Sequence, residues 1–414
     1  DNIVWTGVSV IMLLAGISGM AWWYASRRDD EEKPDGIGTS DPLARWKATP
    51  SQKATIKYFW VVAALIFAQM SLGIITAHYG VEGEGFYGFP LAEYLPYSVS
   101  RTWHVQIGLF WIATAWLAAG LFIGPLVSNQ EPKYQRLGVN ILFGALLLVV
   151  VGSLTGEWLS IKSYMSDTVS FYLGHQGYEY VELGRVWQIA LMAGLLLWLV
   201  LMLRVLWPAL RQKADPATTE ANSQRHLVTL LAVATAAIAL FYGAGLTWGQ
   251  HSHLTMVEYW RWWVVHLWVE GIFELYTTII VAYFFCSLGM VSERSALSVI
   301  YVDILLYLGS GIVGIGHHYY WTAQPAINMA LGSMISAWEV VPLTLLTMEA
   351  WKFVELAKVE GSIKNFSHYW AMMFLIAVGF WNFLGAGVFG FLVNTPIVSY
   401  YEHATYLTSN HGHA

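Results

Sequence analysis

Ten apolar runs of the sequence are each long enough to cross the roughly 30 Å of hydrocarbon in a bilayer as a helix. The chain of 414 residues is 57% hydrophobic and only 12% charged, which is too few charges for the surface of a soluble protein of this size. We therefore expect an integral membrane protein of the all-α class, a polytopic transmembrane helical bundle with ten full spans and the start of an eleventh. The runs cover residues 3–24, 57–77, 103–126, 138–158, 185–207, 227–247, 260–287, 297–320, 328–355 and 368–393, and the eleventh begins near residue 400.

Basic residues predict the orientation of the bundle. Cytoplasmic loops of membrane proteins are enriched in Lys and Arg, and assigning the connections alternately to two sides places 17 of the 21 basic residues on one side. The four on the other side are Arg101, Lys162, Arg185 and Arg261. This asymmetry supports the ten-span assignment and predicts that the basic side is cytoplasmic. The formal net charge of −6 gives no indication of a nucleic-acid partner.

Charge also separates the first span from the rest of the chain. The segment 27–56 is charged and contains Pro and Gly, so we expect an anchor helix over 1–26, a cytoplasmic linker over 27–56 and a helical bundle over 57–414. The chain begins with Asp1 and stops one residue after His413, before the eleventh helix is long enough to span a bilayer. We therefore expect a piece of a longer chain, with the bundle incomplete at its C-terminus.

A histidine and a glutamate lie four residues apart in the apolar stretch WWVVHLWVEGIFE. On a helix this spacing places His266 and Glu270 on one face. The adjacent pair His317 and His318 ends another apolar run, so three imidazoles and a carboxylate can converge between two helices around a metal ion. Such a mixed nitrogen and oxygen shell suits iron better than cuprous copper. The single cysteine, Cys286, excludes a thiolate cluster.

Histidines recur at one level of the expected bundle. His411 and His413 are two residues apart, about 200° around a helix, so they face opposite ways and can bind two different cofactors. Ionisable groups in membrane spans are costly and by default suggest function. With the basic loops inside, histidines gather toward the outer ends of the spans: His104, His266, His317, His318, His411 and His413.

Taken singly, each of these histidines is better explained by a hydrogen bond between helices, and the two C-terminal ones alone would also fit a histidine-rich tail. The spacing of His266, Glu270, His317 and His318 taken together favours a metal site. Histidines at span edges and in loops are interpreted as ordinary interfacial residues: His175, His226, His251, His253, His368 and His403.

Five motifs carry a resemblance to a known family: SRTWHVQ at 100–106, HLWVE at 266–270, GIGHHYYW at 314–321, SAWEVVP at 336–342 and NHGHA at 410–414. In this order they resemble the catalytic core of the haem-copper oxidase superfamily, and more closely its nitric oxide reductase branch. The oxidases usually carry a tyrosine four residues after the first histidine, where this chain has Glu270. The resemblance implies that 57–414 is a catalytic bundle of this type in a bacterial inner (plasma) membrane.

The resemblance also implies three redox centres. A non-haem iron would be held by the constellation of three histidines and Glu270, facing a high-spin haem b3 on His411. A low-spin haem b would be bound by His104 and His413. The implied reaction converts two molecules of nitric oxide, with two electrons and two protons, to nitrous oxide and water.

Carboxylates complete the implied site. Glu339 matches a second glutamate of the family that acts with Glu270 in catalysis, and it could hydrogen-bond Glu270 so that one of the two holds a proton near the irons. The outer-loop pair Glu179 and Glu182 matches glutamates near the haem propionates. The plainer interpretations are a glutamate bonded to a backbone carbonyl for Glu339 and a solvated acidic loop for the pair.

A membrane quinol is the electron donor that the resemblance implies, because the first span with its linker resembles the joint of the quinol-fed type. No CxxCH motif is present, so the chain carries no c-type haem. His78 ends the second span at the outer interface and is followed by Glu82 and Glu84. We interpret these three as a quinol site, because imidazole and carboxylate groups accept the protons that a quinol releases. An interfacial histidine beside an acidic loop is the alternative.

Two other functions stay open at this point. A terminal oxygen reductase would need the tyrosine in place of Glu270, and a metal-free transporter or channel would use the membrane histidines as a relay. The expected partners are nitric oxide, quinol and the lipid bilayer, and the sequence is compatible with a homo-oligomer.

Overall fold

The computed structural model describes residues 1–27, 46–211, 219–319, 322–359, 367–403 and 405–413. Over these residues the predicted all-α membrane bundle is confirmed. Nine described helices are long and apolar enough to cross a membrane, and the bent pair Glu293–Leu308 and Gly311–His318 makes a tenth if it is counted as one span. Each corresponds to one of the predicted apolar runs. The start of the expected eleventh is the eight-residue helix α18, Tyr406–His413.

The described helices form two compact units, and each is described here by itself. Unit 1 comprises Asp1–Trp46, Lys213–Ala234 and His266–Ala414, and unit 2 comprises Lys47–Gln212 and Thr235–Val265. Two elements continue along the chain from one unit into the other: α8 (Thr219–Phe241) and the π-helix η4 (Trp263–Ile272).

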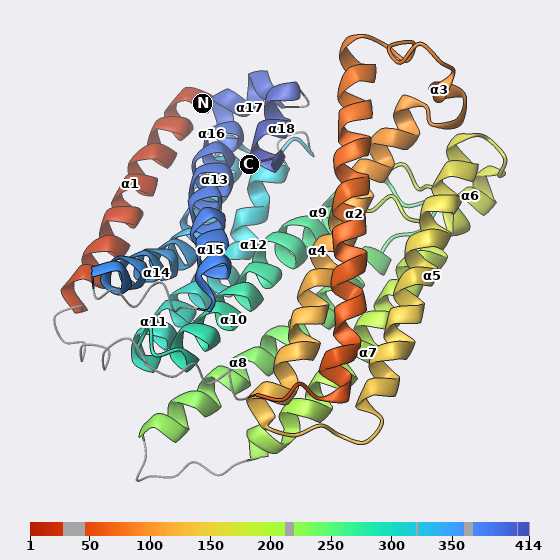
Figure 1. Ribbon diagram of the computed structural model, residues 1–414. Helices are drawn as coiled ribbons and strands as arrows, with labels where there is room; N and C mark the ends of the chain where they lie inside the picture. The colour runs from red at the N-terminus through yellow and green to blue at the C-terminus, as the bar shows by residue number, and fades with distance from the viewer. Residues whose placement is uncertain (28–45, 212–218, 320–321, 360–366, 404, 414) are drawn as a thin grey trace. The chain divides into compact units, whose positions relative to one another are not determined.

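Unit 2 is built on four long helices, α2, α4, α5 and α7 (Figure 1). Apolar side chains such as Leu72, Phe110 and Val150 form their common core. Polar side chains join the helices by donating to backbone carbonyls, as Tyr58 does to Val139 O at 2.6 Å. The elements of the unit are α2 (Pro50–Val81), α3 (Leu91–Tyr94), α4 (Tyr97–Ser128), α5 (Gln135–Ile161), α6 (Asp167–Leu173), α7 (Arg185–Arg211), the 3₁₀-helix η3 (Tyr242–Leu246) and α9 (Leu254–Trp262).

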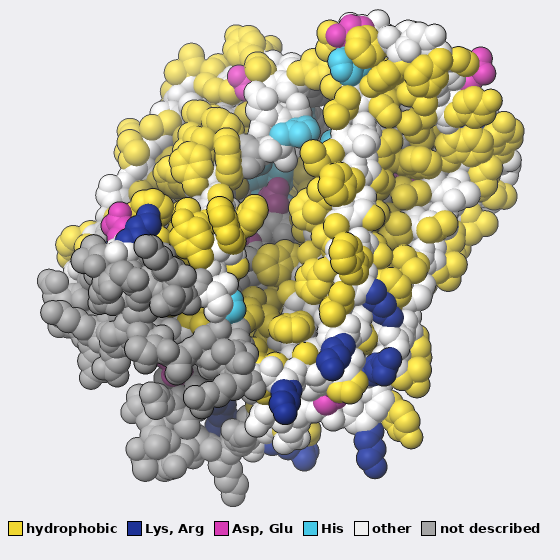
Figure 2. Space-filling view, viewed as in Figure 1, with side chains coloured by type: hydrophobic (Ala, Val, Ile, Leu, Met, Phe, Trp, Pro, Cys, Tyr) yellow, Lys and Arg dark blue, Asp and Glu magenta, His cyan; other side chains and the backbone are white. Residues whose placement is uncertain are grey.

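The surface of unit 2 is apolar along its helices and basic at one end (Figure 2). Trp60 and Phe67 on α2 expose 73% and 71% of their surface, as lipid-facing side chains do. Basic side chains gather around the start of α2, where Lys53 and Lys57 lie. This separation agrees with the orientation predicted from the distribution of Lys and Arg.

Unit 1 contains the histidine and glutamate constellation, and several of its helices are interrupted. Three segments are π-helical, with hydrogen bonds from residue i to i+5, a rare form that is frequent at functional sites. The elements are α1 (Asn2–Arg27), α10 (Phe273–Ser287), α11 (Glu293–Ile304), π-helix η5 (Leu305–Ser310), α12 (Gly311–Gly314), 3₁₀-helix η6 (Ile315–His318), α13 (Ala326–Glu339), α14 (Val341–Val359), α15 (Tyr369–Trp381), π-helix η9 (Asn382–Phe389), α16 (Gly390–Asn394), α17 (Pro396–Glu402) and α18.

We predict that Gly156→Ala destabilises unit 2, because the added Cβ would overlap the backbone carbonyl oxygen of Leu173 at the end of α6. A backbone atom cannot rotate away, so we expect the free energy of unfolding to fall by about 1–3 kcal/mol. Gly144→Ala on the same helix is the matched control, since its Cβ would meet nothing within 4 Å. Thermal unfolding of the purified protein in detergent measures both variants, and equal midpoints would contradict the packing.

Candidate metal centre

The structure brings together the four residues that the sequence predicts as metal ligands. One ligand atom from each of His266, Glu270, His317 and His318 lies within 4.8 Å of the others. His266 Nδ1 is 2.6 Å from Glu270 Oε2 and 3.2 Å from His318 Nε2. His318 Nε2 in turn is 2.8 Å from His317 Nε2. His266 and His317 are buried, and the other two are half-buried.

The geometry of this constellation fits a metal ion. Nitrogen ligands bound to one ion at about 2.0–2.1 Å lie roughly 3 Å from one another, close to the separations between these imidazoles. His317 Nδ1 is buried and has no hydrogen-bond partner among the described residues. Three imidazoles with one carboxylate form a donor set that suits iron. The role of the four residues as ligands stays a prediction.

Local backbone features allow the two histidine-bearing segments to approach each other. His266 and Glu270 share a face as expected, but their segment, η4, is a π-helix rather than an α-helix. A Cβ added at Gly314 would lie 2.8 Å from His266 Nε2, and one added at Gly332 would lie 2.6 Å from His317 N. Both distances are shorter than a normal contact of a Cβ atom, so the close approach of the histidines to these two positions requires glycine there.

Glu339 lies beside the constellation. Its side chain is buried, and a Cβ added at Gly314, which would touch His266, would also lie 3.7 Å from Glu339 Oε1. The expected hydrogen bond between Glu339 and Glu270 is not formed. Glu339 Oε1 is buried without a partner among the described residues, whereas Glu270 bonds to His266. The two carboxylates therefore lie near the same imidazole without contacting each other directly.

Unit 1 also contains a second set of buried polar groups, which was not predicted from the sequence. Glu274 accepts a hydrogen bond from Asn382 Nδ2 at 3.4 Å and is also hydrogen-bonded by Tyr307. Asp303 is fully buried, and Thr278 lies close to its carboxylate. The four-residue spacing of the constellation continues to Glu274, and this repeat is the signal that could have identified it.

Backbone carbonyls orient the three histidines that are expected to bind haem. When Nδ1 of an imidazole donates a hydrogen bond, Nε2 carries the lone pair and is the atom available to a metal. In each ring, Nδ1 lies 2.7–2.9 Å from a carbonyl oxygen: His104 from Gln69, His411 from Gly385 and His413 from Ser409.

Glycines lie against two of these rings. A Cβ added at Gly73 would be 2.7 Å from His104 Cε1, and one added at Gly390 would be 2.8 Å from His411 Cε1. His411 belongs to unit 1, as the constellation does. The expected pairing of His104 with His413 joins residues of different units and stays a prediction.

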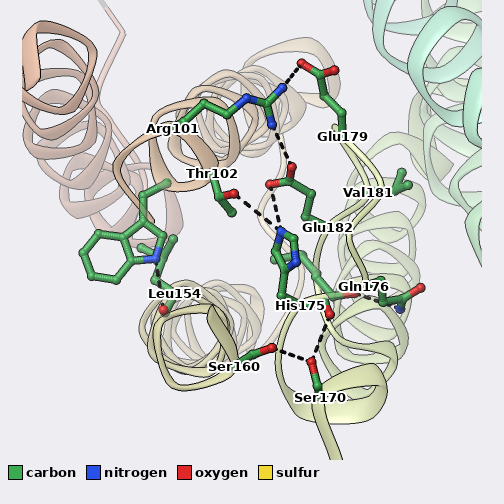
Figure 3. Close-up of polar contacts among 12 residues, drawn as sticks. Arg101, Thr102, Leu154, Ser160, Ser170, His175, Gln176, Glu179, Val181 and Glu182 are labelled. Atoms are coloured by element: carbon green, nitrogen blue, oxygen red, sulfur yellow. Dashed lines mark hydrogen bonds and ion pairs between the residues drawn. The ribbon is translucent and has the colours of Figure 1, made fainter. Parts of the chain in front are cut away.

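In unit 2 the pair Glu179 and Glu182 is bound by Arg101 (Figure 3). The guanidinium donates to Glu179 Oε1 at 2.5 Å and to Glu182 Oε1 at 3.1 Å, and His175 Nε2 lies 3.8 Å from Glu182 Oε2. Glu182 is buried, so the alternative of a solvated acidic loop does not describe it. Neither contact was predicted from the sequence, from which Arg101 received no role and His175 was interpreted as an ordinary interfacial residue.

The candidate quinol residues lie together at the end of α2. His78 Nδ1 is 3.2 Å from Glu82 Oε2, and both side chains are partly exposed. The ring of Phe86 stacks on the imidazole of His78, with 3.9 Å between the ring centroids. Glu84 Oε1 accepts a hydrogen bond from Tyr97 N at 2.7 Å, which places its negative charge at the start of α4. Glu84 is therefore engaged by the backbone, whereas His78 and Glu82 form a pair.

Residues 53–414 match the protein family described as Cytochrome C and Quinol oxidase polypeptide I. The chain belongs to this family. It is also 26% identical over 366 residues to one of the subunits of nitric oxide reductase from Stutzerimonas stutzeri, and this match covers 87% of the chain and 71% of the relative. The chain is thus a nitric oxide reductase-like member of the haem-copper oxidase superfamily and an integral multi-pass bacterial membrane protein. Membership makes it an oxidoreductase, which argues against a metal-free transporter.

We predict that the constellation binds non-haem iron and that His317→Ala lowers its affinity for iron by at least about tenfold. Losing a residue that only orients a metal ligand already costs about tenfold or more in affinity, and losing the ligand itself should cost more. Non-haem iron is the difference between total iron by mass spectrometry and haem iron by pyridine haemochrome. His226→Ala, an exposed position on α8, is the control and should keep its iron. If both variants hold as much non-haem iron as the parent, the ligand assignment is wrong.

Proposed function

We propose that the chain reduces nitric oxide with electrons from a membrane quinol. Two nitric oxide molecules, two electrons and two protons give nitrous oxide and water. The observation that carries this proposal is Glu270, which bonds to His266 within the constellation at the position where oxygen reductases usually have a tyrosine. The similarity to part of a known nitric oxide reductase supports the same assignment.

The proposed cofactors are a low-spin haem b, a high-spin haem b3 and a non-haem iron. His411 would hold haem b3, and its place in the same unit as the constellation, with Nδ1 2.8 Å from Gly385 O, supports this role. His104 and His413 would hold haem b, supported by the backbone carbonyls of Gln69 and Ser409, which orient the two rings through Nδ1. When bound, haem b3 and the non-haem iron would supply the redox chemistry that joins two nitric oxide molecules, with His411 holding the haem and the constellation holding the iron.

The protein's own groups would place the reactants and deliver protons. Glu339 is buried beside the constellation, where an ionised carboxylate is costly, so it suits a proton carrier. Glu270 is half-buried and bonded to an imidazole, so it suits a ligand or close neighbour of the iron. Glu179 and Glu182 would lie near the haem propionates, together with the Arg101 guanidinium that binds them.

Glu270→Ala should abolish nitric oxide reduction while the two haems stay bound, because it removes a carboxylate from the metal site and none of the haem ligands. Glu355→Ala, an exposed glutamate on α14, is the control. Turnover is followed with a nitric oxide electrode, and haem is measured in parallel. A variant that keeps more than about a tenth of the activity, which corresponds to about 1.4 kcal/mol in the barrier, would exclude the role of Glu270. Oxygen consumption in place of nitric oxide reduction by the parent would indicate an oxygen reductase.

His78 and Glu82 are our candidates for the residues that accept protons from quinol. They form a partly exposed pair at the end of α2. The same helix carries Gln69, whose carbonyl orients His104. Gln69 and His78 are nine residues apart, or roughly 14 Å along the helix axis. A quinol at His78 would therefore bind at the helix that also carries Gln69, the residue whose carbonyl orients the proposed haem ligand His104.

The double variant His78→Ala, Glu82→Ala should slow quinol-driven nitric oxide reduction several-fold and leave turnover with an artificial reductant unchanged, because only the quinol route needs these proton acceptors. Glu93→Ala, an exposed glutamate of the neighbouring helix α3, is the control. Steady-state rates with the two electron donors make the comparison. A parallel fall in both rates, or no change in either, would place the quinol site elsewhere.

A further inference from the structure

The first helix, α1, contacts α13 and α17 of the same unit (Figure 1). Ser9 is buried, and its hydroxyl donates to Ala330 O at 3.0 Å. Trp338 Nε1 donates to Leu13 O at 3.2 Å. A third bond runs from the backbone N–H of Ile397 to Thr6 Oγ1 at 3.1 Å. The α1 partners in these bonds are three to seven residues apart, so they lie on the same side of α1.

Gly16 completes this face. A Cβ added at Gly16 would overlap the indole ring of Trp338, so the ring lies directly against the backbone of α1. An indole N–H that leaves water needs an acceptor, and the carbonyl of Leu13, one turn earlier in α1, provides it. The position of Trp338 therefore depends on a glycine in a helix that is more than 300 residues away in the sequence.

Trp338 is next to Glu339, at a break between α13 and α14. Pro342 has no N–H, so it cannot bond to the carbonyl of Trp338 as the residue four positions later does in a regular helix. Helix α13 ends at Glu339, and α14 begins at Val341. At such a break, contacts with other elements fix the backbone. Two of these contacts are the Tyr307 hydroxyl, 3.4 Å from Glu339 O, and the hydrogen bond from Trp338 to α1.

We propose that α1 positions the carboxylate of Glu339 through the contact between Gly16 and Trp338. Glu339 Oε1 faces the glycine side of α12, beside His266. A shift of the α13 end would move this oxygen relative to the constellation. Gly16 and Trp338 are thus positioning residues. Helix α1 then helps to place a carboxylate of the candidate site in addition to anchoring the chain in the membrane. The catalytic importance of that position rests on the proposed function, but the position itself can be measured separately.

The test compares Gly16→Ala with Gly7→Ala and Gly19→Ala in the same helix, where an added Cβ would meet nothing within 4 Å. The infrared band of the Glu339 carboxyl group is identified by its loss in Glu339→Gln. We expect Gly16→Ala to shift this band and to lower nitric oxide turnover on the order of tenfold, and both controls to leave band and turnover unchanged. Trp338→Phe, which removes the N–H without adding bulk, should shift the band in the same way if Gly16→Ala does not fold.

Epistasis shows whether the effect passes through Glu339. In the Glu339→Gln background, Gly16→Ala should cause no further loss of turnover, because residues acting through one group are not additive. A further loss as large as in the parent, or an unchanged infrared band in Gly16→Ala and Trp338→Phe, would overturn the proposal. If the parent does not reduce nitric oxide, the proposed function fails, but the shift of the band still decides whether α1 positions Glu339.

Discussion

Inside a bilayer every backbone N–H and C=O group must find a partner within the protein, because no water is present to replace it. The long helices of unit 2 meet this requirement with α-helical hydrogen bonding, apart from the internal prolines Pro125 in α4 and Pro208 in α7. Among the described residues of unit 1, three π-helical segments replace α-helical hydrogen bonds with bonds from residue i to i+5. Each of these segments carries a polar group in or near the candidate site. Segment η4 carries His266 and Glu270, η5 carries Tyr307, and η9 supplies the carbonyl of Gly385 that orients His411. Irregular backbone is tolerated at membrane depth where it is buried in protein.

Glycines and backbone carbonyls, rather than networks of polar side chains, orient the histidine rings of this bundle. Gly73 and Gly390 leave room for the rings of His104 and His411, and a neighbouring carbonyl fixes each ring. A carbonyl already belongs to the helix, so it adds no further polar group that would have to be buried. Gly16 acts in the same way for the indole of Trp338. Close approach of backbones is thus the common device by which this bundle places its polar side chains.

Hydropathy predicted the helices, and the four-residue spacing predicted the shared face of His266 and Glu270, because both are local properties of the sequence. The approach of His318 to His266, 52 positions away, was predicted from the similar depth of the histidines in the expected bundle. The four-residue spacing of His266 and Glu270 survives the change from α- to π-helix, so the pair was found although the helix type was not. The bond of Arg101 to Glu179 joins residues 78 positions apart and has no local pattern. The separation of Glu270 from Glu339 could not be predicted for a related reason, since spacing along each helix does not give the distance between helices.

The two polar clusters differ in where their positive charge comes from. In unit 2 the carboxylates of Glu179 and Glu182 are bound by Arg101, a cation of the chain itself. In the constellation, His266 Nδ1 lies within hydrogen-bond distance of both Glu270 and His318, and a single ring proton can serve only one of these contacts. Each buried polar atom left unsatisfied costs about 1–3 kcal/mol. A positive ion at the centre would satisfy all four groups at once, and this is the physical reason that the constellation is predicted to bind a metal.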